Sequence, residues 1–471
     1  MEDVKTPDTP VSWWLRPAGW RGLAVILPVV VAIHLLAAAV TIRHSNQDST
    51  ASDQGAEMWL AATAREDILP QRTDGVRHPL WSWVARHAYS ENAAVFFTRG
   101  KWINTAVCVL FLAGLGIAAA RWLDPLALAN LLLLSSLGIL LVRGTYFQPE
   151  PFYYVWSFLA AVLAWRLLRG GALWLWVIFG VICGLAYLSK PSLAPFLIVF
   201  CGAFGFRALL ALRAGGWSIG RNAGGLALAL GILGVMLVPL ALFSASHFGK
   251  PLFNYTKYWM WMDDFETEAW PFQDKYPGGV QLKTLRPEDT PSLGWYFRRH
   301  SAKDFAARLS EGMEGVTVRF FFPEPKLKAG NFFWRKDGKK WEQPLSHRGV
   351  YVFALTALVL VFAAVARPLD LLRSPDAWAR AVFVLGLAGI YSGLYGWYWP
   401  IGKGDRFMGS LWVPCVFLLV WLAWSLRGRM ASRWAGGTYL VVHAAVLLSV
   451  LLQVASLFWK FQHGIYLVTK N

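Results

Sequence analysis

Residues 224–247 read GGLALALGILGVMLVPLALFSASH and contain no Asp, Glu, Lys or Arg. As an α-helix, this run is long enough to cross a hydrocarbon core of about 30 Å, because each residue advances a helix by about 1.5 Å. Backbone groups inside lipid need hydrogen-bond partners within their own segment, and a helix supplies them. The run therefore predicts a membrane-spanning helix.

Similar apolar runs recur along the 471 residues, of which 56% are hydrophobic, more than is usual for a soluble domain. The sequence predicts an all-α integral membrane protein with about eleven transmembrane helices. The runs 152–168 and 172–188 are short and joined by a Gly-Gly link, so a merged or tilted pair is an alternative there. The expected spans lie near 22–40, 102–120, 125–142, 152–168, 172–188, 193–210, 224–247, 349–366, 379–398, 409–426 and 436–458.

The net charge of +17 reflects membrane topology rather than nucleic-acid binding. If residues 1–21 form a cytoplasmic tail, the short inside links carry most of the arginines, whereas the short outside links hold few cations, which is the positive-inside pattern. The inside residues are Arg121, Arg166, Arg169, Arg207, Arg213, Arg221, Arg367, Arg373, Arg380, Arg427, Arg429 and Arg433. The outside residues are Arg143, Lys190, Lys403 and Arg406.

This topology places the two long polar segments and the C-terminus outside the cytoplasm. We expect an N-terminal transmembrane module over 22–247 that contains an extracytoplasmic catalytic loop at 41–101. An extracytoplasmic loop domain at 248–348 and a C-terminal transmembrane module at 349–471 follow. Helices are expected over 53–66 and through Trp83 and His87. The tryptophan-rich second segment is either a small domain or a set of interfacial helices.

Two candidate groups of site residues lie in the first loop. Asp53 follows the first span closely and can act as a general base on an acceptor hydroxyl, with Glu57 one helical turn further on the same face. The alternative is that Asp53 only caps its helix. Arg77 and His78 precede Pro79. Arg77 can pair with a phosphate, and His78 can relay a proton or bind a metal, while a solvated loop arginine is the commoner case.

Two further groups lie at the outer mouths of later spans. Glu150 stands between two prolines after Tyr146, where it can face an acceptor or a metal, or simply favour helix initiation. Lys190 and Arg406 lie at the extracytoplasmic ends of helices, at headgroup depth, where cations can hold a lipid-linked phosphate. Snorkelling towards ordinary lipid is the alternative for Lys190, whereas Arg406, next to Asp405 and glycine, favours a functional role.

The order of these pieces resembles the GT-C membrane glycosyltransferases of the protein-mannosyltransferase and lipid A aminoarabinose-transferase type. The shared pieces are an Asp after the first span, His-Pro-Leu-aromatic at 78–81, Pro-Glu-Pro at 149–151, Leu-Ser-Lys-Pro at 188–191 and Gly-Asp-Arg-Phe at 404–407. The resemblance implies an inverting, multi-pass glycosyltransferase of the bacterial plasma membrane, with its active site outside. The donor it implies is a polyprenyl-phosphate sugar.

By this resemblance, Asp53, with Glu57 and Glu150, would be catalytic. Lys190, Arg406 and Arg77 would bind the donor phosphate, and His78, Tyr146 and Asp405 would contact substrate. Members of the family often have two adjacent acids in the first loop, whereas Gln54 follows Asp53 here. A hard divalent ion wants clustered oxygen ligands, so we expect no obligatory metal and no cofactor.

The residues also support this chemistry without the resemblance. A lipid-phosphate sugar carries its own leaving group, so the protein needs only a base for the acceptor and cations for the departing phosphate. A transporter or flippase would instead show polar groups at mid-membrane, where only His34 and His443 stand out. A ligase or polymerase of lipid-pyrophosphate-linked oligosaccharides would need the same acid and cations and stays an alternative. The sequence does not identify the sugar, the acceptor, the lipid or the oligomeric state.

Overall fold

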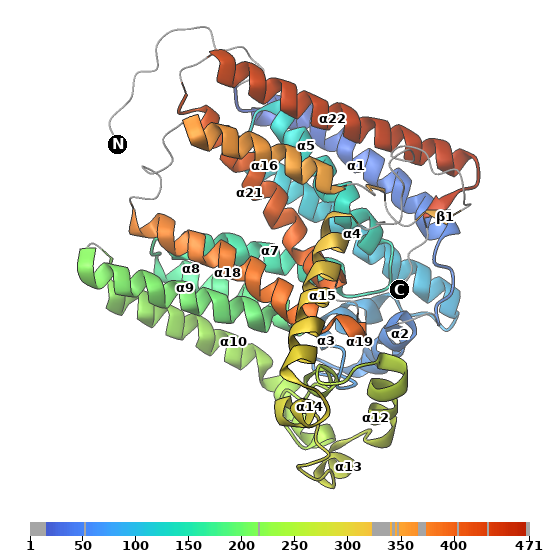
Figure 1. Cartoon of the computed structure of the whole chain (residues 1–471). Coiled ribbons are helices and arrows are strands. Elements are labelled where there is room, and N and C mark those ends of the chain that lie inside the picture. Colours follow the sequence, from blue (N-terminus) through green and yellow to red (C-terminus); the bar gives the residue numbers. More distant parts are fainter. Residues whose placement is uncertain are drawn as a thin grey trace.

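The computed structural model describes residues 16–50, 53–214, 217–322, 340–341, 344–345, 348–365, 374–402, 405–430 and 433–467. Over these residues the chain is almost entirely helical (Figure 1). Two-residue strands, β1 (Lys340–Trp341) and β2 (Tyr466–Leu467), pair in parallel. The all-α prediction is therefore confirmed.

Within this described part, nine helical segments are long and apolar enough to cross a membrane, so the chain is a multi-pass membrane protein. Helices α7 and α8 also occur where spans were expected, but they do not belong to the nine, and the count of eleven stays a prediction. The long helices are α1 (Gly19–His44), α4 (Ala93–Ala119), α5 (Pro125–Ser135) continued by η4 (Ser136–Leu140) and α6 (Leu141–Gly144), α7 (Glu150–Leu167), α8 (Leu173–Ser189), α9 (Leu193–Ala214), α10 (Ile219–Phe248), α16 (Arg348–Val365), α18 (Pro375–Trp397), α21 (Trp412–Arg427) and α22 (Arg433–Gln462).

Helices α7 and α8 are separate elements rather than one merged span. Gly170 between them has a φ of +91°, which favours glycine, and its carbonyl accepts a hydrogen bond from Arg166 at 3.0 Å. Helix α8 then packs closely on α10 through two glycines four residues apart. A Cβ at Gly180 would lie 2.6 Å from the Ala229 carbonyl oxygen, and one at Gly184 would overlap Met236.

The long helices form two groups that lie side by side in Figure 1. One group contains α1, α4, α5, α16, α21 and α22, and the other contains α7 to α10 and α18. Aromatic contacts between α7 and α21 join them: Phe158 and Phe417 have ring centroids 5.8 Å apart, and Trp165 and Trp421 6.2 Å apart.

The shorter helices gather at one end of the bundle (Figure 1). The first polar segment contains α2 (Asp53–Thr63), η2 (Ala64–Glu66), α3 (Pro79–Ala85) and η3 (Arg86–Ala88), so the helices expected there are present. Helix α4 begins at Ala93, well before the expected 102, because the Asn92 side chain caps it by accepting from Ala94 N at 3.0 Å and Val95 N at 3.3 Å. The first polar segment therefore ends about nine residues before the expected boundary at 101.

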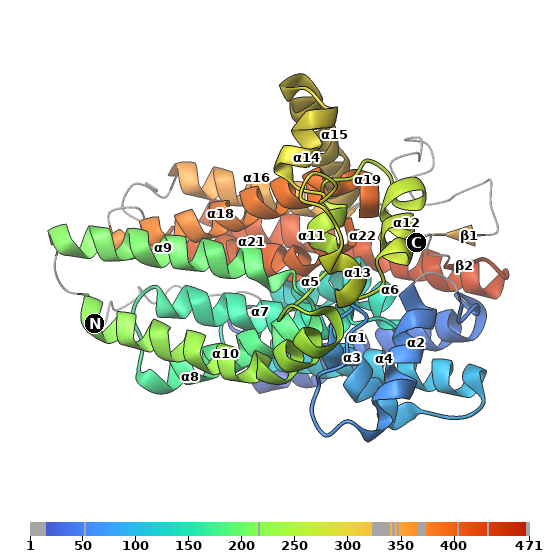
Figure 2. The ribbon, with the colours of Figure 1, turned by 90° about the horizontal axis from the view of Figure 1, so that it is seen from below.

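The second polar segment builds a small aromatic core of its own around Phe253, Tyr255 and Trp259. Its helices are α11 (Thr256–Trp259), η5 (Phe265–Ala269), α12 (Trp270–Lys275), α13 (Gly279–Lys283), α14 (Leu293–Arg299) and α15 (Ala302–Phe321). Figure 2 shows α14 and α15 projecting from the bundle.

Helix α15 crosses the C-terminal end of α18 so closely that a Cβ at Gly312 would overlap the carbonyl group of Gly396. Beyond α18 the chain forms α19 (Trp399–Gly402), α20 (Asp405–Met408) and η7 (Gly409–Leu411) before α21. Helix α15 also packs on α19 and α20, so it covers the segment that connects α18 to α21.

Candidate functional site

Arg77 lies between two carboxylates at the end of the bundle where the polar segments meet. Its guanidinium forms ion pairs with Asp53 at 2.6 Å and with Asp74 at 2.5 Å. Burial opposes the charge of Arg77, but Asp74 and Asp53 outweigh that effect and raise its pKa above the ordinary value. The Asp53 side chain is 30% exposed, against 17% for Arg77 and Asp74, so Asp53 is the more accessible carboxylate of this trio.

A tight turn presents Arg77 to Asp53. The Asp74 side chain accepts hydrogen bonds from Val76 N at 2.9 Å and Arg77 N at 2.7 Å. Gly75 has a φ of +82°, and Tyr255 of the second polar segment donates its N–H to the Gly75 carbonyl at 2.7 Å. Sequence reasoning missed Asp74, although an Asp-Gly pair is a known turn signal.

Glu57 lies on the buried face of α2, which packs against α3. It is only 2% exposed and accepts a hydrogen bond from Ser82 of α3 at 3.0 Å. Burial raises the pKa of Glu57 to about 8, with the charge of Arg77 opposing the rise, so this carboxyl group holds a proton at neutral pH. A catalytic role for Glu57 stays a prediction, and its surroundings are those of a neutral, structural group.

Gln54 occupies the position where the resemblance leads one to expect a second acid. Its amide exchanges two hydrogen bonds with Asn46, at 2.8 Å and 2.9 Å, and also accepts from Phe147 N at 3.1 Å. A carboxylate here could not donate to Asn46, and it would be fully buried. Across the part of the chain that the structure describes, no three His, Cys, Asp or Glu side chains are grouped to share a metal ion.

His78 joins the first loop to α8. Its Nδ1 lies 2.7 Å from the Tyr187 carbonyl oxygen, about one helical turn before Lys190. Burial lowers the pKa of His78 to about 4; the Tyr187 carbonyl and Asp74 oppose this effect, whereas Lys190 adds to it. The imidazole is thus neutral at pH 7 and lies within electrostatic reach of both Asp74 and Lys190.

Lys190 and Glu150 form a buried ion pair at 2.5 Å, with side chains 11% and 2% exposed. The same ammonium lies 4.6 Å from the centroid of the Phe407 ring in α20. Lys190 therefore connects the mouth of α7 with the segment that carries the expected phosphate-binding arginine. Tyr146, expected at the substrate, is 1% exposed, and its carbonyl accepts from the Asn104 amide at 2.6 Å.

Asp405 and Arg406 belong to α20 by their backbone, but their side chains lie outside the described residues. The structure thus brings together Asp53, Arg77 and His78 from the first loop and links His78 to the Lys190 end of α8. A single cavity lined by Asp53, Glu150, Lys190 and Arg406 stays a prediction.

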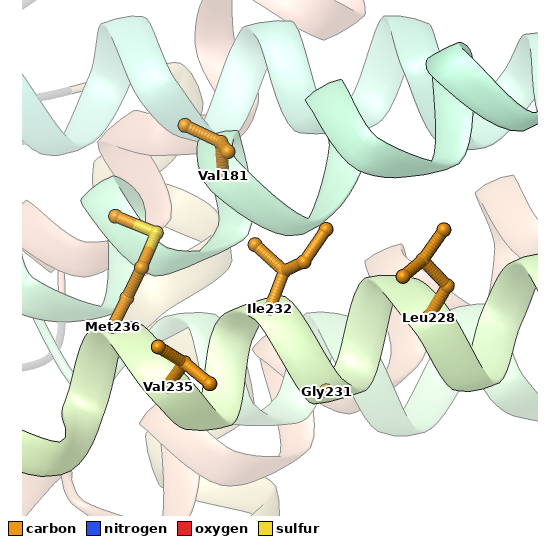
Figure 3. Close-up of a pocket in the computed structure, with 6 residues that line it drawn as sticks. All are labelled: Val181, Leu228, Gly231, Ile232, Val235 and Met236. Atoms are coloured by element: carbon orange, nitrogen blue, oxygen red, sulfur yellow. The ribbon is translucent and has the colours of Figure 1, made fainter.

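A pocket of about 410 Å³ lies elsewhere, between α8 and α10 (Figure 3). Apolar side chains and one glycine line it, so it offers no charge or hydrogen bond for recognising a phosphate or a sugar. Its lining residues are Val181, Leu228, Gly231, Ile232, Val235 and Met236.

No protein-family model and no curated protein sequence matches the chain. Among solved structures, it is similar to the oligosaccharyltransferase AglB from the archaeon Archaeoglobus fulgidus in complex with an inhibitory peptide and a dolichol-phosphate, with a TM-score of 0.50 and 15% identity. The chain has a GT-C-like fold. The match covers 96% of this chain and 56% of that one, so the chain spans a little over half the length of AglB.

The apo form of the Archaeoglobus fulgidus oligosaccharyltransferase also matches, with a TM-score of 0.48 and 15% identity over 97% of this chain and 57% of that one. The match to AglB at a TM-score of 0.50 confirms, as a fold, the GT-C resemblance expected from the sequence. The identity is too low to transfer the role of any single residue.

Proposed function

We propose that the chain transfers a sugar from a polyprenyl-phosphate donor to an acceptor outside the cytoplasm, with inversion. The observation that carries the proposal is the set of contacts around His78. This residue follows Arg77, which pairs with the partly exposed Asp53, and its ring lies 2.7 Å from the Tyr187 carbonyl, three residues before the ion-paired Lys190. In the reaction, an acceptor hydroxyl attacks the anomeric carbon while the bond from that carbon to the phosphate oxygen breaks. Such a reaction needs an acceptor-binding base and a cation for the departing phosphate.

Asp53 is our candidate for the acceptor side, because it is the most exposed of the carboxylates Asp53, Asp74, Glu57 and Glu150. Arg77 was expected at the donor phosphate. Since it already pairs with two carboxylates, we assign it to holding Asp53 in place.

Lys190 is our candidate for the donor phosphate, and Arg406, which precedes Phe407 in α20, is a second candidate. A dolichol-phosphate, bound in the AglB structure, is itself a polyprenyl phosphate, which supports this class of donor. Glu150 would hold Lys190 in position until a phosphate competes for the ammonium. Contacts of His78, Tyr146 and Asp405 with substrate remain part of the proposal, as does a bacterial plasma membrane location.

Transfer of a lipid-linked oligosaccharide is a second candidate function, and the fold likeness to an oligosaccharyltransferase favours it. A transporter or flippase has less support. The mid-membrane groups His34 and His443 engage in interhelical hydrogen bonds, His34 with Ser136 at 2.8 Å and the His443 backbone carbonyl with Asn130 at 2.8 Å.

A donor panel tests the proposal directly. Purified protein in lipid nanodiscs is incubated with undecaprenyl-phosphate-linked glucose, mannose, galactose and 4-amino-4-deoxyarabinose, together with an envelope extract from cells lacking the protein. Release of undecaprenyl phosphate, together with a new glycosylated product in mass spectrometry, is the expected result. Product formation only from pyrophosphate-linked oligosaccharides would select the second candidate, and no release from either donor class would refute both.

A further inference from the structure

His78, which joins the first polar segment to α8, has a defined tautomer. Because the Tyr187 carbonyl can only accept, His78 Nδ1 must carry the proton in the 2.7 Å hydrogen bond between them. Nε2 therefore carries the lone pair. An edge-to-face contact with the Tyr187 ring, with centroids 5.2 Å apart, restricts the imidazole further.

Nε2 is the open side of this imidazole. It has no hydrogen-bond partner among the residues that the structure describes. It is also not among the completely buried polar atoms that lack a partner. The side chain as a whole is mostly buried, with the residue 6% exposed. His78 thus offers a single, pre-oriented proton acceptor.

Charges surround His78 from several elements. Asp74 of its own turn and Lys190 at the end of α8 act on it directly. Each of these two groups has a charged partner: Asp74 pairs with Arg77, and Lys190 pairs with Glu150. Of these groups, Asp74 favours a proton on His78 and Lys190 opposes it. A phosphate that pairs with Lys190 would offset this repulsion, so donor binding would make His78 a better proton acceptor.

Asp53 is less suited to keep the acceptor's proton. Its Oδ1 already accepts a hydrogen bond from the Arg77 guanidinium at 2.6 Å. It can still accept a hydrogen bond and orient a hydroxyl. The proton released during transfer therefore needs a second destination near Lys190.

We propose that His78 is the proton-transfer residue of this site, acting through Nε2. This inference rests on the proposed glycosyl transfer. The acceptor oxygen forms its bond to the anomeric carbon and gives its proton to Nε2, while the departing phosphate takes the electron pair of the bond that breaks. The imidazolium then releases the proton to a phosphate oxygen, which restores neutral His78 and leaves a protonated polyprenyl phosphate.

The His78→Asn substitution distinguishes proton transfer through Nε2 from the structural hydrogen bond between His78 and the Tyr187 carbonyl. The Asn amide can still donate to the Tyr187 carbonyl from near the Nδ1 position, but it has no lone pair at the position of Nε2. We expect thermal stability close to wild type and release of undecaprenyl phosphate lowered on the order of 100-fold or more. His87→Asn, at an exposed histidine of the same segment, should leave release unchanged. Wild-type release by His78→Asn would overturn the proposal.

Nitrogen NMR gives a readout that does not depend on turnover. Ring-15N-histidine protein in nanodiscs is titrated with acid, with and without undecaprenyl phosphate, and the His78 signals are identified by comparison with His78→Asn. We expect a neutral Nδ1–H tautomer whose protonation midpoint rises by about one unit or more when the lipid phosphate is present. An Nε2–H tautomer or an unchanged midpoint would overturn the proposal.

The release assay and the NMR titration together distinguish failure of the proposed function from failure of the role proposed for His78. If wild-type protein releases no lipid phosphate from any donor, the proposed function fails, and the NMR titration still decides whether His78 responds to a phosphate at Lys190. If release is normal but His78→Asn is as active as wild type, only the role of His78 fails.

Discussion

The Asp53→Asn substitution removes the charge that faces Arg77 while keeping nearly the same side-chain shape. Asn also caps a helix about as well as Asp, so α2 should begin at the same residue. The variant therefore distinguishes a carboxylate needed for the reaction from one needed only for local structure.

The structure gives the expected magnitudes. The lost ion pair has side chains 17% and 30% exposed, and Arg77 keeps Asp74 at 2.5 Å, so the cost in stability should be about 1 kcal/mol or less. A group that positions or accepts the reacting hydroxyl contributes on the order of 100-fold or more to rate, which equals about 2.7 kcal/mol in the barrier. Release of lipid phosphate should thus fall far more than stability does.

The assay compares release of undecaprenyl phosphate and thermal unfolding in nanodiscs for wild type, Asp53→Asn and Asp74→Asn. Asp74 is the matched control, because it contacts the same arginine but is engaged with the backbone of its own turn. We expect Asp74→Asn to lose less than about tenfold of the activity, since Asp53 and its arginine remain paired. Full activity of Asp53→Asn, or equal losses of activity in both variants, would show that Asp53 serves only as a counterion of Arg77.

Three further predictions concern stability and topology. Burial raises the pKa of Glu57 from 4.5 to about 8, so the folded protein keeps a proton that the unfolded chain releases. Below about pH 6.5 the buried neutral His78 contributes an opposing slope, so stability should fall between about pH 6.5 and pH 8, by up to about 1.4 kcal/mol per pH unit, and Glu57→Gln should flatten this slope of Tm against pH. Gly312→Ala should lower the stability by about 1–3 kcal/mol because the new methyl meets the backbone of α18, whereas Gly393→Ala, with open space around it, should not; equal Tm values would contradict this packing. Single cysteines at Ser90 and Gly278 should react with an impermeant maleimide in intact cells, and reaction only after permeabilisation would place the site on the cytoplasmic side.

The residues and contacts of the candidate site could be predicted only in part from the sequence. Asp53 at the start of α2 and Lys190 at the end of α8 follow from local chain signals, since one helix begins and another ends there. Asp74 was missed because its turn signal has meaning only once Arg77 is known to face Asp53. Gln54 looked like a departure from the family pattern, whereas its buried hydrogen bonds with Asn46 give it a structural role.

Boundaries were predicted less well than the existence of elements. Helix α4 begins at Ala93 because Asn92 caps it, although the hydropathy signal becomes strong only further along the chain. The separation of α7 from α8 was left open by the short apolar runs, and Gly170 in a left-handed conformation decided it.

The sequence by itself determined that the chain crosses a membrane as helices, because both the cost of exposing backbone groups to lipid and the gain from apolar side chains are properties of a local segment. Its order of short motifs also indicated a GT-C-like protein. The tertiary structure decided which charges pair: His78 meets Tyr187 across 109 residues of chain, and Lys190 meets Glu150 across 40. Such pairs depend on distances between segments, and only the packing of the helices sets those distances.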